Sequence, residues 1–238
     1  MEIKPGHTRR TPEAYLESGG EDVKRALEHH DPFWAPQLVV AGAIALDLAL
    51  PERLTLGPNW LLPSVEGLLL AGLLLASPNP RMRHSPGRRN VAMGLIGLVS
   101  LVNSISLVLL VHYLLHGGKA DGRALIGAGF LLWVTNVLLF GLWYWELDRG
   151  GPVERARMPS AMPDFLFPQM ADPRWAPPEW KPTLVDYLYV SFTNASAFSP
   201  TDTMPLTHAA KWLMTGQSLT ALVTVGLVVA RAVNILSG

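Results

Sequence analysis

Five runs of apolar residues, separated by polar segments, constrain this chain more than any other feature of its sequence. An α-helix rises about 1.5 Å per residue and needs roughly 20 mostly apolar residues to cross a bilayer. Charged residues make up only 16% of the 238 positions and gather between the runs. The sequence therefore predicts an all-α integral membrane protein with about five membrane helices, at residues 33–50, 60–77, 91–115, 124–147 and 212–236.

The first two runs are the weakest of the five. Run 33–50 has Pro36 near its start and Asp47 near its end, and its uninterrupted apolar part is short enough for a re-entrant or tilted segment. Run 60–77 carries Glu66 in its first half. Acidic residues inside a membrane are costly, so Asp47 and Glu66 are either functional or close enough to a helix end to reach the interface. Whether residues 33–50 cross the membrane stays open.

The runs divide the chain into four regions. Residues 1–32 are polar, lack the apolar core of a secretory signal, and are expected to form short surface helices. A four-helix membrane region follows at 33–147, then a Pro- and Trp-rich loop at 148–182. Residues 183–238 hold a hairpin and the last membrane helix.

The distribution of Lys and Arg predicts the orientation. If residues 33–50 cross, twelve of these cations lie on the side of the N-terminus and three on the opposite side. Because cytoplasmic loops carry the excess of Lys and Arg, the N-terminus is then cytoplasmic, in a bacterial-type plasma membrane. If residues 33–50 do not cross, the count is nine against nine and gives no orientation.

Several function classes lack the residues they need. The net charge is zero, so nucleic acid is not an expected partner. There is no cysteine, and the pair His29-His30 beside Asp31 has no further ligands nearby, so we expect neither a metal site nor a cofactor. No Ser-His-Asp set, phosphate-binding loop or dinucleotide motif is present, which argues against an enzyme.

Residues 182–207 are the most informative segment, because they are too polar to span a membrane. Residues 184–195 read as a short helix. Pro200 then removes a backbone donor and favours an extended Ser199, so the helix cannot continue. A long helix with polar residues on it follows at 212–236. Non-helical backbone at membrane depth must be buried in protein or face water.

This order of elements resembles the pore module of the tetrameric cation channels, the superfamily that includes the potassium channels. Asp202-Thr203-Met204-Pro205-Leu206-Thr207 matches the Asp-x-x-Pro-x-Thr tail that follows the filter. The resemblance covers about 55 residues, roughly 182–236. It implies a homo-oligomer, with a tetramer favoured, that passes small ions across the lipid bilayer. It also implies a pore and filter at Thr193, Asn194, Ser196, Ala197, Phe198, Ser199, Pro200, Thr201 and Asp202.

The filter departs from the potassium-channel pattern. Residues 197–201 contain neither of the glycines with which that filter aligns its carbonyls. Potassium selectivity is therefore not expected, and the pore is either non-selective or no longer conducts. A ring of Asp202 side chains would favour cations at one mouth, and Gln217, Thr220 and Thr224 would line the inner helix.

Other interpretations stay open. The hairpin is alternatively a structural corner of a membrane scaffold or accessory subunit that docks a partner through residues 150–182, or the broken helix of a proton-coupled transporter that uses Asp47 and Glu66. Potassium-type loops enter from outside, whereas the charge bias places this loop in the cytoplasm, as in ionotropic glutamate receptors. The polar side chains in the runs either line a path or bond helix to helix: Asn103, His112, Asn136 and Gln217.

Overall fold

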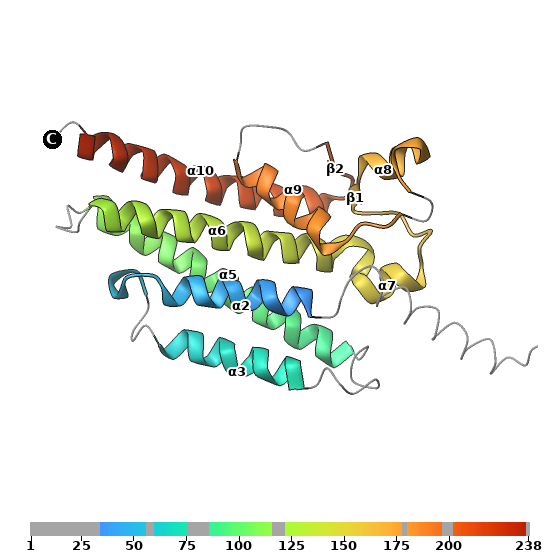
Figure 1. Cartoon of the computed structure of the whole chain (residues 1–238), viewed down its shortest axis with the longest axis horizontal. Helices are drawn as coiled ribbons and strands as arrows, with labels where there is room; N and C mark the ends of the chain where they lie inside the picture. Colours follow the sequence, from blue (N-terminus) through green and yellow to red (C-terminus); the bar gives the residue numbers. More distant parts are fainter. Residues whose placement is uncertain are drawn as a thin grey trace, which may run out of the picture.

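The computed structural model (Figure 1) describes residues 34–55, 60–75, 86–115, 122–177, 180–196 and 202–236. Three sequence predictions lie outside these ranges: the surface helices of residues 1–32, the His29-His30 pair and the filter positions 197–201. The described part is mostly helical, which confirms the all-α prediction.

Five apolar helices lie side by side along the longest axis of the molecule, and successive helices alternate in direction (Figure 1). They are α2 (Ala35–Leu48), α3 (Leu61–Leu75), α5 (Pro86–Leu115), α6 (Gly122–Leu147) and α10 (His208–Leu236). Pro36 and Pro63 lie in the first turns of α2 and α3, where helices tolerate proline because those amides have no partner inside the helix.

Three of these helices are long and apolar enough to cross a membrane, namely α5, α6 and α10. Helices α2 and α3 have 14 and 15 residues. At about 1.5 Å per residue they extend roughly 21 and 23 Å, short of the roughly 30 Å hydrocarbon core. The expectation that α2 and α3 also cross the membrane therefore stays a prediction.

Helix α6 forms the centre of the fold and packs against α2, α5, α9 (Leu184–Ser196) and α10. Of its most apolar 18-residue window, 56% is buried, against 39% for α5 and 17% for α10. The largest core cluster joins α2, α5, α6 and α9 through side chains such as Ala43, Val99, Leu142 and Val190. Helix α10 thus presents most of its apolar surface outward.

The segment between α6 and α9 folds as a cap of short elements. It contains η2 (Asp148–Gly150), α7 (Pro152–Arg157), β1 (Phe165–Leu166), α8 (Pro168–Ala171) and η3 (Pro173–Trp175). Strand β1 pairs antiparallel with β2 (Met204–Pro205), so that Phe165 lies opposite Pro205. The chain turns at Gly150 and Gly151, whose φ angles of 77° and 96° favour glycine.

Helix α9 approaches α6 so closely at Gly141 that a side chain there has no room. A Cβ atom on Gly141 would lie 2.6 Å from Leu188 Cδ2 and 3.1 Å from Leu188 Cα. We predict that Gly141→Ala pushes α9 off α6 and lowers the free energy of unfolding by about 1–3 kcal/mol, the usual cost of overpacking. Thermal denaturation of the protein in mild detergent measures it.

Gly127→Ala is the matched control, because Gly127 lies in the same helix and a Cβ there would meet nothing within 4 Å. The control gains helix propensity without a clash. Equal melting temperatures for the two variants would contradict close packing of α9 on α6.

Candidate functional site

Helices α9 and α10 lie side by side and run in the same direction. Ser218 Oγ donates to Asn194 Oδ1 at 3.1 Å, and Gln217 Nε2 donates to the Ser191 carbonyl at 2.9 Å. Both helices begin at the end of the bundle where β1 and β2 pair (Figure 1). The chain therefore runs into the bundle along α9 and has returned to the same end of the bundle before α10 starts.

Asp148, buried at the end of α6, anchors the entry of this hairpin. Its Oδ2 accepts the Tyr187 hydroxyl of α9 at 2.6 Å, and its Oδ1 accepts the Asp164 amide at 2.7 Å. The buried Arg155 guanidinium donates to the carbonyls of Trp145 and Asp148, at 2.9 and 3.1 Å, and lies over the Tyr187 ring. The start of α9 is thus fixed to the end of α6.

Asp164 anchors the exit. Its carbonyl accepts the Leu206 amide at 2.8 Å, and its carboxylate accepts the Thr207 hydroxyl at 2.6 Å and the Arg149 amide at 2.8 Å. Since Asp164 is itself bonded to Asp148, one connected set of hydrogen bonds holds both ends of the hairpin.

A second network holds the tip of α9 deep in the bundle. Asn194 Nδ2 donates to Gln217 Oε1 at 2.8 Å and to the Met214 carbonyl at 3.0 Å. The Tyr144 hydroxyl of α6 donates to the same Gln217 oxygen, and Gln217 Nε2 donates to Ser191. Gln217 is fully buried, so three helices meet around one amide.

Most of the other predicted site residues bond within their own helix. The hydroxyls of Thr193 and Ser196 donate to carbonyls of α9, and those of Thr220 and Thr224 to carbonyls of α10. Asp202 is exposed beside β2. The structure thus brings Asn194 and Gln217 together from two helices, whereas Ser196 bonds to Thr193, and Thr224 to Thr220, within a single helix.

Sequence reasoning missed the partners of these residues. Tyr144, Ser191 and Ser218 complete the network at the tip, and Asp148 and Asp164 form the anchor. One signal was available for Asp148, because it is an acid placed directly after an apolar run. The others differ in no way from ordinary polar residues in the sequence.

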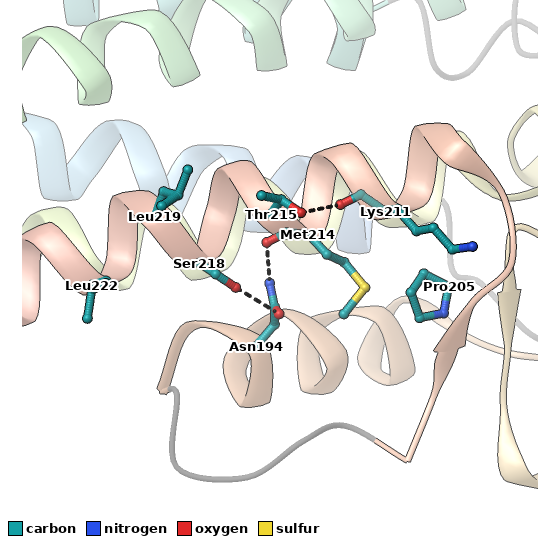
Figure 2. A pocket seen from close by; sticks show the side chains of 8 residues that line it. All are labelled: Asn194, Pro205, Lys211, Met214, Thr215, Ser218, Leu219 and Leu222. Atoms are coloured by element: carbon teal, nitrogen blue, oxygen red, sulfur yellow. Dashed lines mark hydrogen bonds between the residues drawn. The ribbon is translucent and has the colours of Figure 1, made fainter.

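A hollow of about 380 Å³ lies on the outward side of α9, β2 and α10. Figure 2 shows the Asn194 side chain between α9 and α10, with Ser218 and the Met214 carbonyl as its partners. The wall is mainly apolar and carries one cationic side chain. The lining residues are Asn194, Pro205, Lys211, Met214, Thr215, Ser218, Leu219 and Leu222.

The two acids predicted inside the membrane lie elsewhere, on α2 and α3. Asp47 is 3% exposed and Glu66 0%. Both carboxyl groups are therefore buried within the chain. In the described ranges, no group of three His, Asp or Glu side chains is placed to hold a metal ion.

An ion pair between Arg174 and Asp172 lies on the surface of the cap. Arg174 donates to both carboxylate oxygens of Asp172, at 2.6 to 3.0 Å. This hydrogen bonding lowers the pKa of Asp172 below its ordinary value. Asp172 is therefore an anion at neutral pH whose charge is already matched by Arg174.

We predict that Gln217→Leu lowers the free energy of unfolding by about 1–3 kcal/mol, because it leaves the buried Tyr144 hydroxyl without its acceptor. Thr215→Val is the control, since Thr215 is exposed on the same helix and bonds only to Lys211 of its own helix. Thermal denaturation in detergent compares the two. Similar melting temperatures would show that the network does not hold α9.

No family model matches the chain, and neither the curated proteins nor the solved structures include a significant match.

Proposed function

We propose that this chain forms a homo-oligomeric membrane pore that passes small cations, with residues 182–207 as its pore loop. The observation that supports the proposal is the re-entrant course of the hairpin. Helix α9 and helix α10 start at one end of the bundle and run in parallel. The same order, a short helix, a returning loop and a long inner helix, is expected from the resemblance to tetrameric cation channels.

The outward face of α9 and α10 supports an assembly of several copies. Of the most apolar 18-residue stretch of α10, only 17% is buried within the single chain. Large apolar side chains are exposed along both helices, among them Tyr189, Phe192, Leu219, Leu222 and Val229. A loop as short as this one closes a pore only at the axis of a ring of subunits, and a tetramer is the favoured number.

We assign different roles to the polar residues of the hairpin. Asn194 to Asp202 form the constriction, and the exposed Asp202 contributes a ring of negative charge at one mouth. Gln217 holds the tip of α9 in place, since it is buried within one chain. Thr220 and Thr224 lie on the inner helix of the pore.

We propose that the hairpin enters from the cytoplasmic side. The end of the bundle at which α9 begins also carries Arg89, Arg149, Arg155 and Arg157. Cytoplasmic ends of membrane proteins are rich in Arg and Lys. The N-terminal end of α2 lies at the same end of the bundle (Figure 1), which agrees with a cytoplasmic N-terminus in a bacterial-type plasma membrane.

A second candidate function is that of a membrane scaffold whose cap docks a partner. It is favoured by three large apolar side chains that the cap exposes, Met158, Met162 and Trp175, at 54%, 73% and 64%. A pull-down that loses its partner when these three residues are changed to Ser, from a protein that shows no ion flux, would favour the scaffold over the pore.

Asp202→Asn tests the pore directly. We predict that liposomes containing this variant retain flux but lose cation preference by several-fold, because the ring of carboxylates at the mouth becomes neutral. Asp172→Asn is the control, since Asp172 is an acid of the cap whose charge Arg174 already matches. Unchanged selectivity in Asp202→Asn would remove Asp202 from the pore.

The mass of the purified protein in mild detergent, measured by light scattering with correction for bound detergent, tests the assembly. We expect four copies of the 26.0 kDa chain. A stable monomer would contradict the pore, because no ring of loops could then form.

A further inference from the structure

The hollow between α9, β2 and α10 is elongated along α10. The side chains that α10 contributes recur every three or four residues from Lys211 to Leu222, so they form one stripe on the helix. Asn194 of α9 lies beside this stripe, and Pro205 of β2 lies at the end where Lys211 is (Figure 2). The hollow is therefore a groove that follows the helix axis.

The length of the groove matches one leaflet of a bilayer. Eleven residues separate Lys211 from Leu222, which is roughly 16 Å at about 1.5 Å per residue. Half of a hydrocarbon core about 30 Å thick is about 15 Å. Because α10 is long and apolar enough to cross a membrane, a lipid chain that starts level with Lys211 would follow the groove to its other end.

The groove is apolar along most of its length. Met214, Leu219 and Leu222 line it, and its hydroxyl and amide donors already have partners inside the chain. Thr215 Oγ1 donates to the Lys211 carbonyl at 2.8 Å and Ser218 Oγ to Asn194 Oδ1 at 3.1 Å. Asn194 Nδ2 donates to the Met214 carbonyl at 3.0 Å. The middle of the groove thus suits a ligand segment that has no polar atoms.

Lys211 provides a positive charge at one end of this apolar groove. Within the described ranges, no acidic side chain forms an ion pair with it. Figure 2 shows its side chain extending toward Pro205 of β2, and so toward the end of the bundle where α10 begins. A lysine near the end of a membrane helix extends its ammonium group to the polar interface in this way.

Exposed tryptophans indicate where that interface lies. Trp212, next to Lys211, is 75% exposed, and Trp34, before α2 at the same end of the bundle, is 59% exposed (Figure 1). Trp60 is 61% exposed before α3, at the opposite end. Tryptophan side chains gather where the hydrocarbon meets the lipid headgroups. The Lys211 ammonium group therefore lies at the level of the headgroups.

We propose that this groove binds an anionic phospholipid, with its phosphate at Lys211 and one acyl chain along Met214, Leu219 and Leu222. A zwitterionic headgroup carries its own cation and gains less from an unpaired ammonium group, so Lys211 favours a lipid with net negative charge. The proposal requires α10 to lie in a membrane but requires no pore, so it goes beyond the proposed function.

A second copy of the chain is the competing occupant of the groove. Helix α10 contains no Asp or Glu, so another α10 packed on the groove would leave Lys211 without an anion. Successive residues of a helix lie about 100° apart, which places Trp212 and Val223 away from the stripe of Lys211 and Leu222. Both are exposed in the single chain. A lipid on the side of α9 thus leaves another face of α10 for contacts between copies.

Lipid binding to the full chain in mild detergent tests the site. The protein is equilibrated with equal amounts of phosphatidylglycerol and phosphatidylcholine that have the same acyl chains, and native mass spectrometry counts the lipids retained per chain. We expect one phosphatidylglycerol per chain, favoured about fivefold, the effect of one lysine near an anionic lipid. Glycerol 3-phosphate, which has the anion without the acyl chains, should not displace it.

Two pairs of variants separate the headgroup from the acyl chain. Lys211→Gln should remove the preference for phosphatidylglycerol, whereas Lys181→Gln, at an exposed lysine before α9, should keep it. Leu222→Gln should reduce the retention of both lipids several-fold. Val223→Gln changes the next residue, which is exposed outside the groove, and should bind as the unaltered protein does. All four residues are exposed, so the variants are expected to fold.

Three results would overturn the proposal. They are equal retention of the two lipids by the unaltered protein, a preference that survives in Lys211→Gln, and a Leu222→Gln variant that dissociates an oligomer but retains the same lipid. The last result would assign the groove to a second copy. Because the readout is bound lipid and not flux, a monomer that retains phosphatidylglycerol contradicts only the pore, and an oligomer without lipid preference contradicts only this site.

Discussion

One buried carboxylate, that of Asp148, fixes the arrangement on which the rest of the hairpin depends. It stands at the end of the central helix, accepts the Tyr187 hydroxyl at the start of α9, and accepts the amide of Asp164, which in turn binds Leu206 and Thr207 before α10. Arg155, buried beside it with 4.0 Å between Nη1 and the carboxylate, compensates its charge. Replacing either Arg155 or Asp148 by a neutral residue would leave the other as a buried charge without compensation, which is strongly destabilising.

The anchor explains how α9 can be both short and deeply inserted. At about 1.5 Å per residue, 13 residues reach roughly 20 Å, so the tip of the helix ends inside the bundle. The tip is then held by amides, with Asn194 and Gln217 bonded to each other and to α6 and α10. Because these bonds lie on the inner side of α10, its opposite face stays exposed in the single chain.

The sequence predicts local structure well and contacts between distant residues poorly. The short helix expected at residues 184–195 is Leu184–Ser196, and the run at 91–115 ends where α5 does. Periodicity and breakers such as Pro200 act over a few residues, so one chain is enough to read them. The pairing of Tyr144 with Gln217 spans 73 positions and depends on how helices pack. Nothing in the sequence ranks Gln217 above Thr220 or Thr224, although only the first is bonded to two other helices.

The same limit applies to Asp47 and Glu66. From the sequence alone, each acid is close enough to the end of its run for the interface to satisfy it. In the structure α2 packs against α3 and α6, both acids are buried, and their carboxylate oxygens have no hydrogen-bond partner. The buried polar groups around α6 thus fall into two kinds. Those at the tip of α9 and its contact with α10, namely Ser191, Asn194 and Gln217, have their hydrogen bonds within the protein, whereas the carboxylates of Asp47 and Glu66 and the amide oxygens of Asn103 and Asn136 have no partner in the described chain. Because these oxygens lose hydration that no group of the described chain replaces, the difference between the two kinds arises from how the helices pack, which no local sequence pattern predicts.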